Sequence, residues 1–191
     1  DSMWVEVARD KNLYKQSFSR GLPTSKLENL GSVSNRRGTT VWFHPDPIIF
    51  GEKAKMKPGW LYRMARSKAY LYSGVEIRWS CDPLLIEEGS DIPAQAVLHF
   101  PGGLKDYLDT AMHGRPCLTP TSFSGKIPLP ENAGRVEFAV AWPEHGEGFS
   151  NSYCNTIPTP QGGTHEAGLR TALSRGIRSY AEMTGNKKAG V

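Results

Sequence analysis

The sequence predicts an α+β fold, in which pairs of short strands lead into one long helix. Runs of alternating apolar and polar residues, typical of half-buried strands, recur through residues 3–44 and 75–142. A pattern with apolar residues three and four apart then begins near Thr164 and continues to Met183. With 191 residues, 38% of them hydrophobic and 22% charged, the chain is long enough for one or two small cores.

Four runs in the first part of the chain have the composition of strands: residues 3–9, 13–18, 27–33 and 39–44. The turn-forming trio Asp10, Lys11 and Asn12 separates the first two runs, which predicts a β-hairpin. The third and fourth runs flank a short polar segment and are predicted to form a second hairpin. Pro45 and Pro47 end the last of these strands, because proline cannot donate to a strand ladder.

The middle of the chain alternates helices and strands. Pro58 suits the first turn of a helix and Gly74 suits its end, so residues 58–73 are predicted to be helical. A second, short helix is predicted over residues 104–112. Strands are expected at four further places: residues 75–80, 94–100, 120–129 and 134–142.

The last helix is preceded by a strand and a stiff bend. Residues 152–156 are predicted to form the strand, and the bend contains residues that neither a strand nor a helix continues: Pro158, Pro160, Gly162 and Gly163. Thr164 is placed to cap the helix, and Glu166 lies where a carboxylate favours the positive helix end. Gly185 supplies the stop signal.

The predicted last helix has two different faces. One is an apolar stripe that we expect to be buried: Leu169, Ala172, Leu173, Gly176, Ile177, Tyr180 and Met183. Arg170, Ser174 and Arg178 follow one another at four-residue spacing on the opposite side. Lys187 and Lys188 lie just past the predicted end.

The charge of the chain permits a polyanionic partner without requiring one. The 23 Lys and Arg residues against 19 Asp and Glu residues give a net charge of +4 and an isoelectric point near 9.0. Cys81, Cys117 and Cys154 are widely spaced, which favours reduced cysteines in a cytoplasmic protein. The sequence has no run long enough to span a membrane and no leader pattern. It begins with Asp1 and enters a strand at once, which predicts a piece of a longer protein.

The sequence predicts neither a catalytic residue nor a metal ligand in this chain. The glycine pairs at 102–103 and 162–163 do not form a phosphate-binding loop, and no GxSxG motif is present. His165 and Glu166 begin an HExxH pattern that lacks its second histidine. His165 is therefore expected to pack or to hydrogen-bond at the start of the helix.

Four segments resemble the B subunits of bacterial type IIA DNA topoisomerases. The run NTIPTPQGGTHEAGLRTALSR is similar to the signature that opens the long helix of their transducer domain. RGLP and RRGTTVWFHPDP are similar to the closing strands of their GHKL-type ATPase domain, and FPGGLKDYL to the junction between the two domains. The resemblance implies the end of an ATPase sandwich over residues 1–101. Residues 102–191 would then be an incomplete transducer, a sheet backed by helices with left-handed βαβ crossovers.

The resemblance also implies roles for individual residues. Arg9 matches an arginine that borders the nucleotide pocket, and Gly38 and Thr39 match the Gly-Thr pair that helps to bind the adenine edge. Arg170 matches a basic residue that lines the cavity through which DNA passes, and Arg178 lies on the same side of the helix. Without the resemblance, the favoured interpretation is an ordinary one: a solvated charge for each arginine and a normal strand residue for Thr39.

The implied activity is that of an ATP-dependent type II DNA topoisomerase, whose transducer passes ATP-driven closure towards the DNA-cleaving partner. Its partners would be DNA, the A subunit of the enzyme and, on ATP binding, a second copy of the B subunit, with no membrane involved. ATP and Mg²⁺ would be cofactors of the longer protein, and none is expected on these 191 residues. HPDPIIFG, RWSCDP and FPGGLKDYL favour topoisomerase IV over gyrase. A free-standing nucleic-acid-binding α+β module is the alternative from another class.

Overall fold

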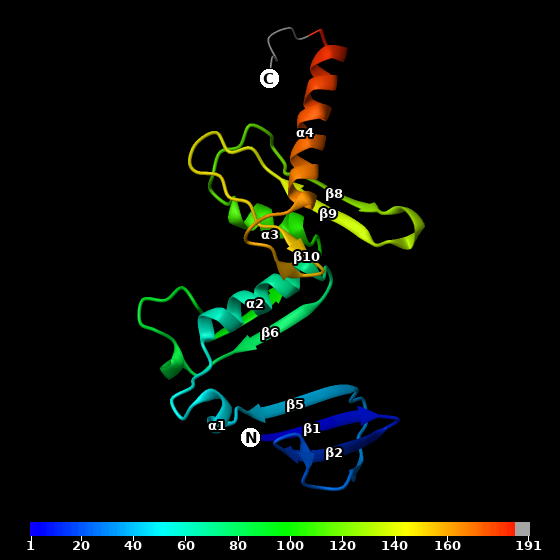
Figure 1. Cartoon of the computed structure of the whole chain (residues 1–191), viewed down its shortest axis with the longest axis vertical. Helices are drawn as coiled ribbons and strands as arrows, with labels where there is room; N and C mark the ends of the chain where they lie inside the picture. Colours follow the sequence, from blue (N-terminus) through cyan, green and yellow to red (C-terminus); the bar gives the residue numbers. More distant parts are fainter. Residues whose placement is uncertain (186–191) are drawn as a thin grey trace. The chain divides into compact units, whose positions relative to one another are not determined.

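The computed structural model describes residues 1–185, and these residues form two compact units, the first over Asp1–Lys57 and the second from Pro58 onwards (Figure 1). Each unit is considered by itself. Lys187 and Lys188, predicted to follow the last helix, lie outside the described residues.

The first unit is an antiparallel sheet built on one hairpin. Its strands are β1 (Ser2–Arg9), β2 (Asn12–Ser19), β3 (Leu22–Pro23), β4 (Glu28–Ser32) and β5 (Gly38–His44). The order is β3-β2-β1-β5, and β4 also pairs with β2. The predicted β1–β2 hairpin is confirmed, with Asp10 and Lys11 at φ values of 51° and 60° in its turn. A turn with both central residues at positive φ matches the twist of the strands it joins.

The predicted second hairpin is wrong, because β4 and β5 do not pair with each other. β4 pairs with β2, whereas β5 pairs along the whole of β1 on the other side of the hairpin. The Val33 N–H donates to the Lys11 carbonyl at 2.8 Å, so the chain passes the β1–β2 turn on its way from one edge to the other. β4 thus pairs with the β2 edge of the first hairpin, and β5 pairs with its β1 edge.

A one-turn helix, α1 (Pro47–Phe50), closes the first unit. Asp46 caps it by accepting from the Ile48 N–H at 2.9 Å, and the Arg20 Nε lies 2.8 Å from the other oxygen of the carboxylate. The Ile48 N–H, followed by the Arg20 charge, holds the pKa of Asp46 below its ordinary value although the residue is buried. The carboxylate therefore stays charged and ties the end of the sheet to α1.

The second unit begins with a helix packed on a hairpin. Its helix α2 (Pro58–Leu71) contacts β6 (Glu76–Ser80) and β7 (Gln95–His99), with a short 3₁₀ turn at Pro83–Leu85 between the strands. Alternate residues of both strands face the helix, and Leu98 is the most buried of them. The predicted helix and both predicted strands are confirmed.

A second layer of the same kind follows along the chain. Helix α3 (Leu104–Ala111) contacts the hairpin of β8 (Phe123–Pro128) and β9 (Arg135–Val140), which are joined through a 3₁₀ turn at Pro130–Asn132. Leu108 and Met112 are the buried residues of this helix and its cap. The predicted short helix and the strand pair are confirmed, with strands shorter than expected.

The segment before the last helix differs from the prediction in two ways. The expected strand over residues 152–156 is reduced to β10 (Tyr153–Cys154), because the chain reverses at Asn155 and Thr156 and returns as β11 (Ile157–Pro158). Helix α4 (Thr164–Met183) is confirmed, but its cap is Gly163 rather than Thr164, and no side chain bonds the cap. Thr164 is instead the first helical residue.

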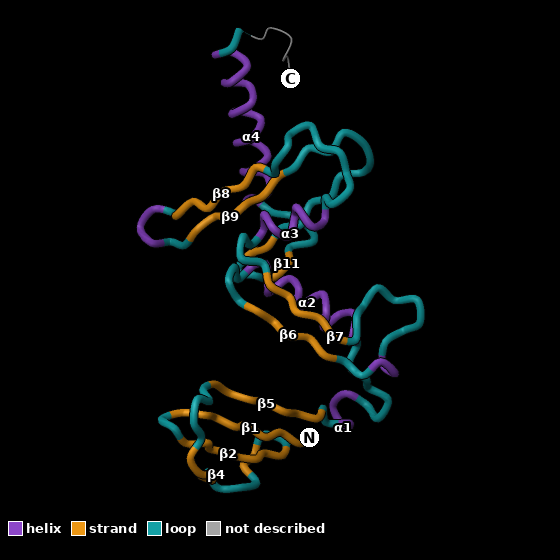
Figure 2. Tube along the Cα trace, turned by 180° about the vertical axis from the view of Figure 1, so that it is seen from behind, coloured by secondary structure: helices purple, strands orange, loops and turns teal. Residues whose placement is uncertain are grey.

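The apolar stripe of α4 is exposed, which contradicts the expectation that it is buried. Ile177, Tyr180 and Met183 are 50%, 68% and 85% exposed, and Leu169 and Leu173 are half-buried. Figure 2 shows the second half of α4 running past the β8–β9 hairpin without another described element beside it. The end of the helix is as predicted, since Gly185 has a φ of 68° directly after the cap residue.

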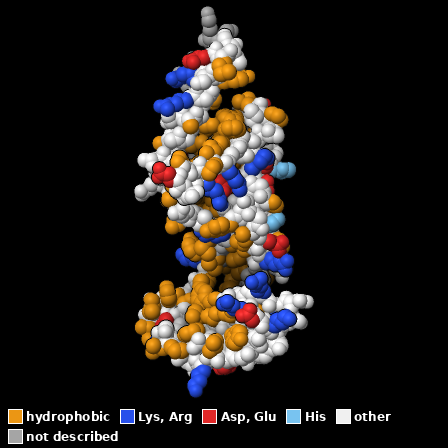
Figure 3. All heavy atoms as spheres, turned by 90° about the vertical axis from the view of Figure 1, so that its right-hand side faces the viewer, with side chains coloured by type: hydrophobic (Ala, Val, Ile, Leu, Met, Phe, Trp, Pro, Cys, Tyr) orange, Lys and Arg blue, Asp and Glu red, His pale blue; other side chains and the backbone are white. Residues whose placement is uncertain are grey.

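The α+β fold class is confirmed, and the buried core is small. All strand pairings among residues 1–185 are antiparallel, so the implied left-handed βαβ crossover stays a prediction. Buried apolar side chains of the described part are few: Ala8, Ala69, Tyr70, Leu98, Leu108, Met112 and Ala181. Hydrophobic side chains are visible on the surface of both units (Figure 3). None of the helices described here combines the length and the apolar character that a membrane crossing requires.

Candidate functional site

The site begins with the bend that delivers the chain into α4. The Thr159 N–H donates to the Ser152 carbonyl at 2.8 Å, and the Gly162 N–H donates to the Thr159 carbonyl at 2.8 Å. Pro158 and Pro160 restrict the backbone between these bonds. The start of the helix is thus held in place by the short strands β10 and β11, by the two prolines and by the backbone hydrogen bonds of the turn.

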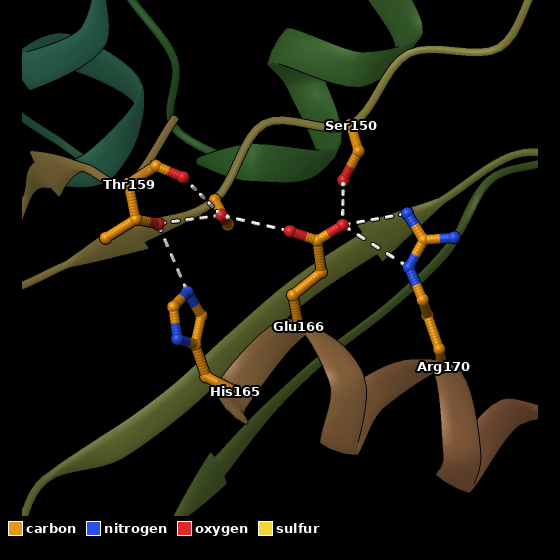
Figure 4. Close-up of polar contacts among 6 residues, drawn as sticks. Ser150, Thr159, His165, Glu166 and Arg170 are labelled. Atoms are coloured by element: carbon orange, nitrogen blue, oxygen red, sulfur yellow. Dashed lines mark hydrogen bonds and ion pairs between the residues drawn. The ribbon is translucent and has the colours of Figure 1, made fainter. Parts of the chain in front are cut away.

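Glu166 is the centre of the polar contacts at this point (Figure 4). Its Oε1 accepts from Ser150 Oγ at 3.1 Å and from Arg170 Nη2 and Nε at 2.7 and 3.3 Å, while its Oε2 accepts from Ser152 Oγ at 3.4 Å. Arg170, and then Ser150, hold the pKa of the Glu166 carboxyl below its ordinary value. The carboxylate is therefore ionised at neutral pH and connects the loop before β10 with the first turn of α4.

Gly162 leaves room for this carboxylate. Its φ is 73°, and a Cβ built on it would lie 3.1 Å from Glu166 Oε2. A side chain at this position would both strain the backbone and crowd the carboxylate. Gly162 thus forms part of the turn and also allows the Glu166 carboxylate to lie close to the backbone.

Arg170 is held on one side and exposed on the other. The spacing of four residues from Glu166 is the favourable order for a helical ion pair, with the acid nearer the N-terminus. The Arg170 side chain is nevertheless 69% exposed, and Figure 4 shows its third guanidinium nitrogen pointing away from the carboxylate. An oriented guanidinium with free solvent access is able to contact a phosphate while its partner fixes its direction.

His165 makes the kind of contact that the sequence predicted. Its Nε2 lies 3.3 Å from Thr159 Oγ1, and that hydroxyl lies 2.7 Å from Ser152 Oγ. The histidine thus shares a hydroxyl with the bend, and the carboxylate of Glu166 bonds serines rather than the imidazole. This order of contacts is not that of a catalytic triad, in which a nucleophile, a base and an acid are hydrogen-bonded in sequence. Within residues 1–185, no group of three or more acidic, histidine or cysteine side chains is arranged to hold a metal ion.

An open hollow of about 420 Å³ adjoins these residues, lined by residues 150–153, 158–162 and Glu166. Most of its lining side chains are polar, whereas small-molecule pockets are mostly apolar. The hollow therefore favours a hydrated turn over a buried ligand.

Arg178, the second predicted DNA contact, is exposed and lies on α4 eight residues beyond Arg170. That spacing is about 12 Å along a helix axis. Two arginines at that separation present positive charge along one helix. Their contact with DNA stays a prediction.

The three residues predicted to meet a nucleotide lie together in the first unit. Gly38 pairs with Ala8 and Thr39 pairs with Val7, so Arg9, Gly38 and Thr39 share one end of the β1–β5 pair. The Arg9 side chain is 79% exposed, and its Nε lies 3.5 Å from the Asp10 carboxylate. Their role in nucleotide binding stays a prediction.

Sequence reasoning missed two members of the site and one contact. Ser150 and Ser152 lie in a loop, where the sequence carries no signal for their bonds to the carboxylate. The ion pair of Glu166 with Arg170 has a signal, the i to i+4 spacing of an acid before a base, which indicates such a pair on a helix.

Comparison with known proteins gives consistent relatives. The family described as DNA gyrase B matches residues 103–191. The B subunit of DNA topoisomerase 4 from Bartonella bacilliformis is 53% identical over 191 residues, all of this chain and 28% of the relative. The corresponding protein from Caulobacter vibrioides is 50% identical over 188 residues, covering 96% of this chain and 27% of the relative. The chain thus spans just over a quarter of the length of these curated relatives.

Solved structures agree in fold. The 43K ATPase domain of Thermus thermophilus gyrase B, solved with an aminocoumarin, has a TM-score of 0.82 at 29% identity, over 99% of this chain and 49% of that one. The topoisomerase IV ATP-binding domain of Francisella tularensis, solved with a small-molecule inhibitor, has a TM-score of 0.70 at 28% identity, over 98% of this chain and 47% of that one. The GHKL-type fold expected from the resemblance is therefore confirmed.

The curated relatives named above are B subunits of topoisomerase 4, which confirms the preference for topoisomerase IV over gyrase. The high identity extends over the whole chain, and the bend before α4 with its Gly-Gly-Thr-His run lies inside the region that the family matches. The chain belongs to the family of bacterial type IIA DNA topoisomerase B subunits, within which it is similar to the B subunit of topoisomerase 4.

Proposed function

We propose that the chain is part of the ATPase and transducer region of an ATP-dependent type II DNA topoisomerase, the B subunit of topoisomerase IV. In this role it couples ATP-driven closure to DNA strand passage, and so to relaxation and decatenation. The observation that carries the proposal is the identity of 53% to a topoisomerase 4 relative over the complete chain. Its proposed partners are DNA, the A subunit and a second B subunit, in the cytoplasm.

The proposed division places the end of the ATPase domain in residues 1–101 and the transducer in residues 102–191. Two features support it: the gyrase B family match begins at residue 103, and Gly103 is the cap residue directly before helix α3. The compact units divide between Lys57 and Pro58 instead, so the proposed boundary after residue 101 rests on the family match and not on compact packing.

ATP and Mg²⁺ are the proposed cofactors of the longer protein, and Arg9, Gly38 and Thr39 are the proposed contacts to the nucleotide. The clustering of the three at one end of the β1–β5 pair supports this assignment. We propose further that these 191 residues alone neither bind Mg-ATP saturably nor hydrolyse it. A calorimetric titration of the chain tests this, and a micromolar affinity would overturn it.

Arg170 and Arg178 are the proposed DNA contacts, and the contact is sequence-independent. An arginine that approaches the DNA backbone releases condensed counterions, so its contribution weakens as salt rises. The exposure of Arg170 and its fixed direction support this role. Glu166 then acts as a positioning residue for the guanidinium.

The experiment that tests the function uses the full-length protein with its A subunit, relaxed plasmid, linked DNA circles and ATP. Relaxation and decatenation without supercoiling are expected. Introduction of negative supercoils would instead make the protein a gyrase component, and binding of nucleic acid without any ATP-dependent strand passage would favour the free-standing module.

A charge reversal at Arg170 tests the DNA contact. Arg170→Glu should reduce strand passage and DNA-stimulated ATP turnover, with basal ATP hydrolysis nearly intact. Arg175→Glu is a matched control, because it reverses an exposed charge on another side of the same helix. Strand passage by Arg170→Glu equal to wild type across a salt series would remove Arg170 from the mechanism.

A further inference from the structure

Helix α2 and the turn between β10 and β11 are more than 80 residues apart in the sequence but are joined by side-chain contacts. Lys68 Nζ donates to both the carbonyl and the hydroxyl of Thr156, each at 2.8 Å. Two residues further along α2, the hydroxyl groups of Tyr70 and Tyr153 share a hydrogen bond. Both contacts join helix α2 to the short β10–β11 hairpin.

Tyr70 is the most enclosed large side chain in this region. It is 4% exposed, and its ring stacks on that of Tyr107 with centroids 4.0 Å apart. The rings of Tyr153 and Phe100 meet it edge-on, with centroids 6.0 and 6.1 Å away. Burial raises the pKa of the Tyr70 hydroxyl, so the group stays protonated and always has a hydrogen to share. A packed ring with a bonded hydroxyl holds a helix rigidly.

The turn that receives these contacts is strained. Asn155 and Thr156 have φ values of 46° and 69°, a conformation that usually selects glycine at its second position. Threonine is branched at Cβ and disfavours positive φ. The chain nevertheless has threonine here, and both of its oxygen atoms accept from Lys68. Backbone strain held by a distant lysine favours a role for the turn beyond reversing the chain.

A continuous line of contacts leads from this turn to the start of α4. Tyr153 pairs with Pro158 in the β10–β11 hairpin, and the next residue on each side, Ser152 and Thr159, are joined through backbone and hydroxyl bonds. Ser152 then donates to Glu166, which holds Arg170. Each step in this line is a strand pairing or a direct hydrogen bond.

We propose that Lys68, Tyr70, Tyr107, Tyr153 and Thr156 form a mechanical joint that fixes the start of α4 to α2 and carries displacement of α2 to Arg170. The proposal rests on the proposed topoisomerase function, in which a change on the ATPase side must reach the DNA side. Two contacts connect α2 with the β10–β11 turn in this joint: the hydrogen bonds of Lys68 to Thr156, and the tyrosine cluster around Tyr70. Through them, a displacement of α2 moves the turn and the start of α4. Coupling through the joint requires that α2 and the start of α4 move together.

The test uses the full-length protein with its A subunit, and compares ATP consumed with DNA strands passed. Lys68→Met removes the hydrogen bonds to Thr156, and Tyr153→Phe removes the hydroxyl bond to Tyr70. Both variants keep most of the side-chain volume. Each should raise the ATP consumed per strand passed about two- to tenfold, with basal ATP turnover unchanged. Lys68→Arg should recover much of the coupling, because it keeps a cationic donor. Tyr72→Phe is the matched control, since Tyr72 lies just beyond α2 and is 50% exposed.

A second readout follows the joint without reference to activity. Amide hydrogen exchange over residues 153–162 should accelerate roughly ten- to a hundredfold in Lys68→Met, the loss expected for a hydrogen bond to a charged group, and should not change in Tyr72→Phe. An unchanged exchange rate, or an unchanged ratio of ATP to strands passed in an active enzyme, would overturn the joint. If wild-type protein passes no strands, the proposed function fails, and the exchange measurement alone then decides the joint.

Discussion

Replacement of Glu166 by glutamine should strengthen the contact of Arg170 with DNA and make it more sensitive to salt. In the native protein, two guanidinium nitrogens donate to one carboxylate oxygen at 2.7 and 3.3 Å, so the two charges of the pair balance. Glutamine keeps the length of the side chain and one acceptor oxygen but removes the negative charge. The pair therefore changes from no net charge to +1, while its geometry is largely retained.

The magnitude follows from the number of charges exposed to DNA. Each additional phosphate contact steepens the dependence of log affinity on log salt by about 0.9 for duplex DNA. Over a salt range from about 50 to 200 mM, that slope corresponds to an additional three- to fourfold loss of affinity. Arg170 is 69% exposed, so the released charge can meet a phosphate without rearrangement of the helix.

The assay is fluorescence anisotropy of a labelled duplex with the full-length protein over a salt series. Glu166→Gln should bind more tightly at low salt and with the steeper slope, whereas Arg170→Gln should show a slope no steeper than wild type. In the double variant most of the gain should be lost, because the glutamine acts through the arginine. Equal slopes for wild type and Glu166→Gln, or a gain that persists in full without Arg170, would refute the reasoning.

The same pair predicts a pH dependence. Arg170, and then Ser150, lower the pKa of Glu166 from its ordinary 4.5, so the carboxylate is ionised in the folded protein throughout the neutral range. The contribution of the ion pair to stability is present above that ordinary value and is lost as pH falls through the lower folded value. Wild type should therefore match Glu166→Gln in DNA affinity only in acid, and the difference between them should be constant from about pH 6 to 8.

Three substitutions test the packing. Gly103→Ala should destabilise the chain by about 1–3 kcal/mol in urea unfolding, because φ 68° with ψ −127° is a conformation for glycine, whereas Gly148→Ala, with open space around it, should change stability by less than about 0.5 kcal/mol. Leu98→Ala should cost about 2–5 kcal/mol, since Leu98 is 5% exposed, and Leu84→Ala, at 92% exposure, should again be nearly neutral. Gly168→Ala should stabilise α4 by about 0.5–1 kcal/mol, measured as slower hydrogen exchange in that helix. A Cβ there meets nothing within 4 Å beyond its chain neighbours and the backbone of its own helix, and alanine has the higher helix propensity.

The parts of the fold that were predictable are those with local signals. The β1–β2 hairpin follows from alternation on both sides of a turn-forming trio. Helix α2 follows from Pro58 at its first position and from the glycine beyond its end. These patterns depend on neighbours within a few residues, so the sequence alone contains them.

Strand pairing was less predictable, because it depends on which edges are free. β4 and β5 have strand composition and lie on either side of a polar segment, which is also what a hairpin requires. Each instead pairs with one strand of the first hairpin, and only the complete sheet determines that choice. The cap of α4 was misplaced by one residue for a related reason. Gly163 is extended, and the helix therefore begins at Thr164 without a side-chain cap.

The candidate site divides in the same way. Arg170 came from resemblance to a family, and the charge of Glu166 was predicted only as a favourable interaction with the helix end. The pairing of Glu166 with Arg170 was missed, although the four-residue spacing of an acid before a base signals it. The two serines that complete the contact lie in a loop, where no sequence signal points to them. The contacts of Lys68 with Thr156 bridge 88 residues, and no periodicity or motif in the sequence signals a bond of that kind.

The exposed stripe of α4 links the errors of prediction to the proposed function. The pattern correctly predicted the helix, and a helix in a folded protein gains most of its stability by packing its apolar face. Tyr180 and Met183 are nevertheless 68% and 85% exposed. Single exposed side chains are ordinary, but a stripe along one helix face indicates a surface that is covered in use. The curated relatives are more than three times as long as this chain, so the stripe supports the proposal that these residues work as one part of a longer coupling protein.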